Sequence, residues 1–147
     1  MKSTMFAAVA LVGSVLSPLV HAQVNGPIQG KIPFSFYVGS KALPAGNYVV
    51  RPIGSMHNVL AIQNADNHAT ALTIVPIGVQ AATAQNTKLV FHRYGNTYFL
   101  SQVWQGFGRS EGLQLVPSTT ERELATRVMV AMKTGKAEVA SIPFRRK

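Results

Sequence analysis

Side chains that could act together chemically gather in one segment, which reads KLVFHRYGNTYFLSQVW and covers residues 88–104. It contains His92, Arg93, Tyr94 and the single tryptophan, Trp104. Histidine can act as a base or a ligand, and aromatic rings beside polar groups can hold a sugar or a peptide. His92, Tyr94 and Trp104 are therefore the candidate binding residues. Ordinary cross-strand pairing within a β-hairpin is the alternative explanation for the same residue types.

The other histidines do not form a metal-binding pattern. His57 and His68 fall in segments that we expect to be turns, and no histidine has a second ligand at a suitable spacing. The five acidic residues are scattered, so paired carboxylates are not expected either. We therefore predict no metal and no cofactor.

A short motif, Gly108 to Gly112, matches the G-x-S-x-G pattern of hydrolases around Ser110. That pattern requires a strand before the serine and a helix after it. Here a glycine-rich loop precedes Ser110, LQLVP follows, and no histidine lies beyond position 92. We predict no catalytic residues. An enzyme assembled from His92 and Ser110, around the hairpin and loop of residues 88–112, is an alternative.

The N-terminus, MKSTMFAAVALVGSVLSPLVHAQ, has the features of a secretory signal peptide. Lys2 precedes the apolar residues 5–16, and small residues before and at Ala22 suit cleavage there. The apolar stretch is shorter than the ~20 residues of a membrane span. We expect a signal peptide over residues 1–22 and a mature chain, residues 23–147, exported to the periplasm or beyond without a transmembrane segment.

The composition indicates a basic protein that folds without disulfides. The 147 residues include no cysteine, and 14 Lys and Arg against 5 Asp and Glu give a net charge of +9. Without disulfides, an exported chain must be stabilised by its core, and the expected mature length suffices for a single domain. The basic residues are scattered without interleaved aromatic side chains, so sequence-specific nucleic-acid binding is not expected.

The mature chain has the pattern of a mainly β protein. After a flexible lead-in over residues 23–30, strict alternation in KIPFSFYV predicts a strand over 31–38. Residues 39–46 have turn composition, and residues 77–86 are expected to form a surface loop. Further strands are expected over residues 47–53, 58–64, 69–77, 88–94, 97–104 and 137–144.

Gly95-Asn96 predicts a two-residue hairpin turn, which places Tyr94 opposite Thr97 and His92 opposite Phe99. Strict alternation then assigns the hairpin side chains to two faces. One face would carry Leu89, Phe91, Arg93, Tyr98, Leu100 and Gln102. The other would carry Val90, His92, Tyr94, Thr97, Phe99, Ser101 and Val103.

One amphipathic helix is expected over residues 118–134, and either Ser118 with Glu121 or Thr120 with Glu123 fits a capping box at its start. The resulting fold class is an antiparallel β-sandwich or flattened barrel of about seven strands, closed by this C-terminal α-helix.

The blocks KIPFSFYVGSKALPAGNYVV, KLVFHRYGNTYFLSQVW and ERELA resemble a family of small exported proteins from soil bacteria. That family shares an IPFxFxVGxKxLPAGxY opening and an LVFHRYGxxYFLSQxW centre, and its function is unknown. The resemblance covers most of the mature chain and implies an exported bacterial domain. It provides no catalytic residues.

These observations favour an exported, non-enzymatic binding or envelope-associated structural module, whose partner would be an envelope polymer or a protein. Besides the hydrolase-like enzyme, a second alternative is an assembly subunit. Its extended segment 23–38 would add as a strand to the sheet of a neighbouring molecule.

Overall fold

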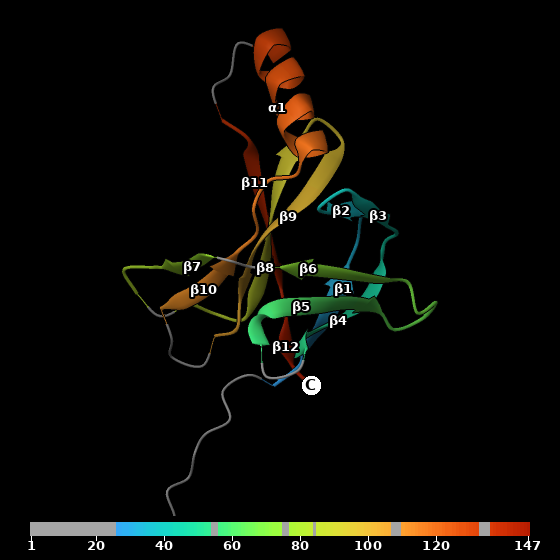
Figure 1. Ribbon diagram of the computed structural model, residues 1–147, viewed down its shortest axis with the longest axis vertical. Helices are drawn as coiled ribbons and strands as arrows, with labels where there is room; N and C mark the ends of the chain where they lie inside the picture. The colour runs from blue at the N-terminus through green and yellow to red at the C-terminus, as the bar shows by residue number, and fades with distance from the viewer. Residues whose placement is uncertain (1–25, 54–55, 75–76, 84, 107–109, 133–135) are drawn as a thin grey trace, which may run out of the picture.

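Two β-sheets pack face to face in the computed structural model (Figure 1). The structure describes residues 26–53, 56–74, 77–83, 85–106, 110–132 and 136–147. The expected signal peptide and residues 23–25 lie outside the described residues.

The first sheet has five strands, and every neighbouring pair is antiparallel. In spatial order they are β12 (Arg145–Arg146), β1 (Ile28–Ile32), β4 (Gly46–Ile53), β5 (Met56–Asn64) and β6 (Thr70–Ile74). The second sheet has seven strands, five of them in a continuous antiparallel order. These are β11 (Glu138–Pro143), β8 (Lys88–Tyr94), β9 (Thr97–Trp104), β10 (Glu111–Gln114) and β7 (Ile77–Gln80).

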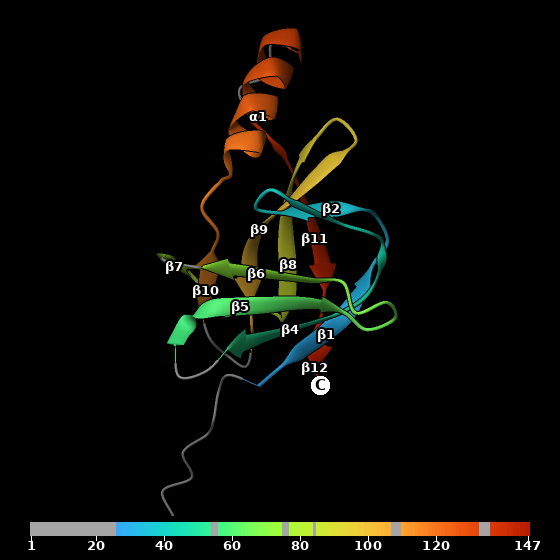
Figure 2. The same cartoon turned by 45° about the vertical axis from the view of Figure 1, so that its right-hand side comes forward.

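Two short strands complete the second sheet. β2 (Phe36–Val38) runs parallel to β9, with Tyr37 opposite Phe99, and antiparallel to β3 (Lys41–Leu43). Tyr37 and Phe99 also stack, with ring centroids 5.0 Å apart. The strands of the two sheets cross steeply, as Figure 2 shows, which is the orthogonal form of sheet packing.

Apolar side chains from both sheets form one core. Members from the first sheet include Ile28, Tyr48, Leu60 and Ile62, and members from the second include Phe36, Leu89, Phe91 and Val103. The sheets do not close on one another, so the predicted mainly β fold is confirmed as a sandwich rather than a barrel. The described residues form twelve strands instead of about seven. One expected strand is divided into β1 and β2, β3 and β7 lie in segments that were expected to be a turn and a loop, and β10 and β12 were not expected.

The strand expected over residues 31–38 is wrong in one respect. It is two strands, β1 and β2, which belong to different sheets and are separated by Pro33 to Ser35. The predicted alternation still holds, because Ile32, Phe36 and Val38 are buried. Proline cannot donate to a ladder and therefore favours the break.

The expected flexible lead-in is also shorter than predicted. Residues 28–30 belong to β1, and Ile28 is fully buried. β1 is hydrogen-bonded to β12 on one edge and to β4 on the other. Within the segment that a strand-adding subunit would donate, residues 28–32 and 36–38 are already paired with strands of their own chain.

The predicted hairpin forms, and its register is confirmed near the turn. Tyr94 lies opposite Thr97, and His92 lies opposite Phe99. Only Gly95 of the two turn residues has a positive φ, 62°, which is the pattern of a type II′ turn.

A β-bulge farther from the turn overturns part of the predicted face assignment. The register shifts between Val90 and Phe91, so Val90 lies opposite Gln102, and Leu89 lies opposite Val103. The extra residue in β9 is Ser101. Val103 consequently joins the core, whereas Gln102 and Trp104 share the face of His92, because a one-residue shift exchanges the faces of a strand.

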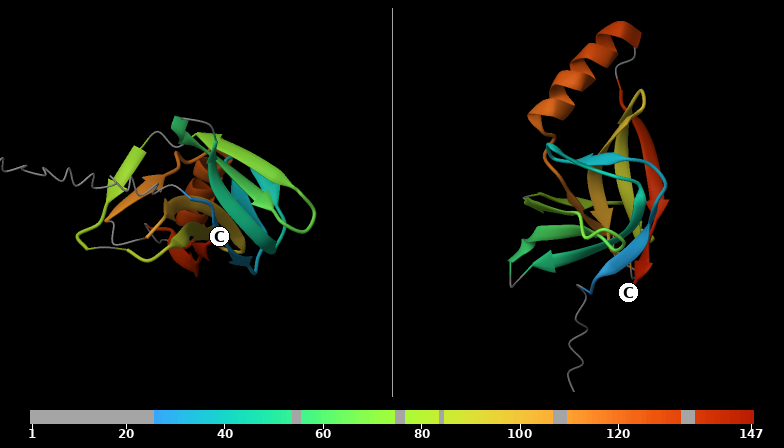
Figure 3. Two further views of the ribbon diagram at one scale, coloured as in Figure 1. Left: turned by 90° about the horizontal axis from the view of Figure 1, so that it is seen from below. Right: turned by 90° about the vertical axis from the view of Figure 1, so that its right-hand side faces the viewer.

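The helix α1 (Thr119–Met132) extends away from the sheets at one end of the molecule (Figure 3). Its predicted start agrees with the structure to within one residue, and residues 133 and 134 lie outside the described ranges. Leu124, Ala125, Val128 and Met129 form its half-buried side, whereas Val130 is 78% exposed. None of the helices within the described part of the chain is long and apolar enough to cross a membrane.

Replacing Gly30 with alanine should destabilise the sandwich. A Cβ atom there would lie 2.5 Å from Cδ1 of Phe144, and the body of that buried ring would have to move. We expect the free energy of unfolding to fall by about 1–3 kcal/mol, the usual cost of overpacking a core. Urea denaturation would measure it. Gly78→Ala is the matched control, because a Cβ there meets nothing within 4 Å, and an equal loss in both variants would contradict the assignment.

Candidate functional site

A buried carboxylate joins the helix to the hairpin. Glu121, in the first turn of α1, is 5% exposed. Its Oε1 atom lies 2.9 Å from Nδ1 of His92 and accepts a hydrogen bond from the Tyr94 hydroxyl at 3.3 Å. Both partners project from the same face of β8, because they are two residues apart on one strand. Glu121 thereby bridges an element of the second sheet to the start of α1.

The local sequence explains why this carboxylate reaches the sheet. The backbone N–H of Glu121 donates to Oγ of Ser118 at 3.1 Å, which is the first half of the predicted capping box. In the second half, the glutamate side chain would turn back to the helix start. Instead, Oε1 of Glu121 contacts His92 and Tyr94. The preceding segment is also attached to β9, because the N–H of Leu115 donates to the carbonyl of Ser101 at 2.8 Å.

The network continues from the imidazole to a serine. Oγ of Ser101 lies 3.1 Å from Nε2 of His92. Because a carboxylate only accepts hydrogen bonds, Nδ1 of His92 carries the hydrogen toward Glu121. In the neutral ring, Nε2 then accepts from the Ser101 hydroxyl. Alternation along β9 places Ser101 on the His92 face of the hairpin, and the bulge changes only the faces of the residues that follow it.

The order serine, histidine, carboxylate is that of a catalytic triad, but the exposure of the serine differs from what a nucleophile requires. Ser101 is 4% exposed, and its carbonyl accepts a hydrogen bond from the backbone N–H of Leu115, which is also buried. An acyl-transfer nucleophile must reach a substrate carbonyl. The geometry is therefore that of a polar anchor that fixes the angle of α1.

The structure unites two of the three candidate binding residues. His92 and Tyr94 meet at Glu121, with ring centroids 6.3 Å apart. Trp104 lies at the far end of β9, where Nε1 donates to Gln102 at 2.9 Å and Nζ of Lys88 lies 5.9 Å from its ring. Trp104 therefore contributes to the packing of β8, β9 and β10 rather than to the anchor.

Sequence reasoning missed Glu121 and Ser101 as members of this site. The capping-box pattern indicated where Glu121 would lie, but it assigned the carboxylate to the helix itself. Strict alternation did place Ser101 on the His92 face. Nothing in the sequence indicated the bulge or the approach of the helix.

Of the two residues considered for an enzyme, His92 belongs to this site and Ser110 lies elsewhere. Ser110 precedes strand β10 instead of a helix, and its carbonyl accepts a hydrogen bond from Ala81 at 2.7 Å. Gly108 and Arg109 lie outside the described residues.

His68 is an exposed turn residue with φ of 60°, as expected. The prediction for His57 is wrong, because it belongs to strand β5 rather than a turn. The described residues contain no group of three or more potential metal ligands.

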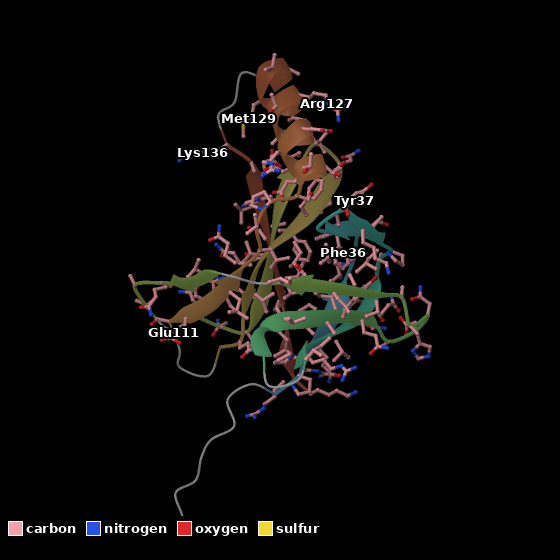
Figure 4. All side chains as sticks on the ribbon, viewed as in Figure 1. Phe36, Tyr37, Glu111, Arg127, Met129 and Lys136 are labelled. Atoms are coloured by element: carbon pink, nitrogen blue, oxygen red, sulfur yellow. The ribbon has the colours of Figure 1, made fainter. Side chains whose placement is uncertain are left out.

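A cleft of about 200 Å³ opens beside the anchor, between α1, the hairpin tip and the start of β11. Its lining includes Tyr94 from the anchor, Val128 and Met129 from the helix, and Lys136 before β11. Met129 points to the side of the helix where Lys136 lies, whereas Arg127 points to the other side (Figure 4). The other cation of the lining, Arg93, is paired with Glu138 at 3.2 Å.

Comparisons with known proteins identify no relative of this chain. A scan against protein-family models, a search of curated proteins and a search of solved structures each find no match. The resemblance to the soil-bacterial exported family therefore stays a prediction.

Removing the anchoring carboxylate should loosen the attachment of α1. We expect Glu121→Ala to lower the free energy of unfolding by about 1.5–3 kcal/mol, the range for hydrogen bonds to a charged group. Glu123→Ala is the matched control, because Glu123 is exposed on the same helix and its only described contact uses the backbone carbonyl. That control should change stability by no more than about 0.5 kcal/mol. Equal urea midpoints for the two variants would contradict the anchor.

Tyr94 should make stability fall at alkaline pH. Burial, the charge of Glu121 and the hydrogen bond to it raise the pKa of Tyr94 above its ordinary value of 10.0. Above pH 10.0 the unfolded chain releases this proton while the folded protein retains it, so the free energy of unfolding decreases as pH rises toward the folded pKa.

Tyr94→Phe should therefore show a shallower loss of stability between about pH 9 and about pH 11 than the parent protein. Urea denaturation across that range would measure both slopes. Tyr48, whose pKa is also raised mainly by burial, is present in both proteins and does not affect the difference. Parallel slopes would contradict the contact between Tyr94 and Glu121.

Proposed function

We propose that this protein is an exported, non-enzymatic binding module that docks an exported protein partner at the cleft between α1 and the β8–β9 hairpin. The cleft is the observation that carries the proposal. It lies between a helix that stands clear of the sandwich and a hairpin that the core holds in place (Figures 1 and 3). The features of a signal peptide in the sequence support an extracytoplasmic location.

The lining of the cleft favours a peptide segment as the occupant. Val128, Met129 and Ala137 provide apolar contacts, and the backbone at Gly95 and Asn96 lies at the rim. Methionine adapts to varied apolar shapes, which suits it to partner surfaces. Lys136 is exposed next to these side chains. A partner segment with an apolar side chain followed by a carboxylate would match this arrangement.

The anchor supports a binding role because it makes the helix a fixed wall of the cleft. Tyr94 belongs to both the anchor and the cleft lining. A preformed wall reduces the conformational entropy that a partner must overcome on binding.

Substitution within the cleft should abolish partner capture from an envelope fraction. We expect Met129→Asp to lose the bound protein, because the new carboxylate would be buried against an apolar segment. Val116→Asp is the control, since Val116 is 53% exposed and is not part of the cleft. Affinity capture followed by mass spectrometry would compare the variants. Identical protein partners for both variants, or none with the parent protein, would contradict the proposal.

The non-enzymatic part of the proposal has its own test. A fluorophosphonate probe, which acylates activated serines, should leave both Ser101 and Ser110 unmodified, since Ser101 is buried and Ser110 lacks a helix after it. Intact-mass analysis would detect labelling. Stoichiometric labelling that disappears in Ser101→Ala or Ser110→Ala would favour the hydrolase alternative.

A further inference from the structure

A second and larger cleft lies at the other end of the molecule. It has a volume of about 530 Å³, within the range of small-ligand sites, and strands β1, β4 and β12 contribute to its walls. These strands lie at the opposite end of the molecule from α1 (Figures 1 and 2). The cleft is therefore separate from the proposed docking site.

The side chains of this cleft are basic and amide-bearing. Lys31 and Arg145 supply two cations, and Gln29 and Asn47 supply amide groups. The described lining contains no acidic side chain. A carboxylate outside the lining, that of Asp66, accepts hydrogen bonds from the backbone and side-chain nitrogens of Asn47 at 3.4 and 3.3 Å.

Strand pairing places these four side chains in two neighbouring rows. Gln29 lies opposite Arg145, and Lys31 lies opposite Asn47. Directly paired residues share one face of a sheet, and so do residues two apart on the same strand. Each cross-strand pair thus combines one cation with one amide. The cation is on β12 in the first pair and on β1 in the second.

Phe144 and Tyr48 also belong to the lining, but they alternate with Arg145 and Asn47 along the chain and therefore face the core. Phe144 and Tyr48 are 7% and 1% exposed. Their rings are too buried to serve as platforms on which nucleobases stack, which is how single-stranded nucleic acids are usually held. Amide groups that both donate and accept hydrogen bonds suit hydroxyl groups instead. The combination of cations and amides matches a ligand that carries both carboxylates and hydroxyls.

We propose that this cleft binds an acidic polysaccharide, with the carboxylates of successive uronate residues on Lys31 and Arg145 and the sugar hydroxyls on Gln29 and Asn47. The net charge of +9 would attract such a polymer over a longer range. The inference does not depend on the proposed docking of a protein at α1.

Isothermal titration of the full mature chain with a linear hexameric uronate tests the inference. The double variant Lys31→Glu with Arg145→Glu should bind at least about tenfold more weakly, since one hydrogen bond between charged groups contributes about a factor of ten. The control is Arg122→Glu with Arg127→Glu on α1, which changes the net charge equally at the other end of the molecule. Its affinity should match that of the parent protein.

Three further ligands identify the chemistry that is recognised. A neutral hexasaccharide should bind far more weakly than the uronate. Linear polyphosphate and a single-stranded oligonucleotide should lose no more affinity in the cleft variant than in the charge-matched α1 variant. Equal losses in the two double variants would overturn the inference, because binding would then follow net charge alone. So would the absence of uronate binding, or tighter cleft-dependent binding of any of the other three ligands.

Discussion

The position of α1 against the β8–β9 hairpin depends on one buried carboxylate, that of Glu121. Removing Glu121 from water has a free-energy cost, which its hydrogen bonds to His92 and Tyr94 offset. α1 otherwise presents only a half-buried apolar side to the rest of the molecule. A few apolar contacts would permit several angles between helix and hairpin, whereas directional bonds to two rings on one strand select one. The cleft at the helix exists because that angle is fixed.

The two clefts give the molecule distinct ends. The sandwich between them is held by a continuous core, so a ligand at one end and a partner at the other would be kept at a constant separation. The cleft at the helix end combines apolar side chains and an exposed lysine with the ion pair of Arg93 and Glu138, whereas cations and amides line the cleft at the β1–β4–β12 end. The proposed protein partner and the proposed acidic polymer would therefore not compete for one site.

Much of the fold followed from local patterns. Alternation identified the core residues of the first strands, and Gly95-Asn96 predicted the hairpin turn and the pairing of His92 with Phe99. The departures have tertiary causes. The bulge at Ser101 turns the side chain of Val103 into the core, where it packs with residues of the opposite sheet. Strand alternation alone does not specify that packing. The break after β1 likewise lets one alternating segment serve two sheets.

Local patterns identified two residues of the candidate site, His92 and Tyr94, but did not identify Glu121 or Ser101 as members. His92 and Tyr94 stood out by residue type, but Glu121 comes from an element 27 residues after Tyr94 and carries a local helix-capping signal of its own. Residue type grouped Trp104 with His92 and Tyr94, but its ring packs over Gly112, where an added Cβ would lie 2.7 Å from the indole. Local sequence rules describe which side chains share a strand face, and not which distant helix will meet that face.

The central claim is that Glu121 fixes α1 against the hairpin, and a distance measurement tests it most directly. The chain has no cysteine, so spin labels can be attached at Val130→Cys on α1 and Asn96→Cys at the hairpin turn without other changes. Pulsed electron paramagnetic resonance should give one narrow distance distribution, which broadens when Glu121→Ala is added and stays narrow with Glu123→Ala. Distributions of equal width in all three proteins would contradict the account.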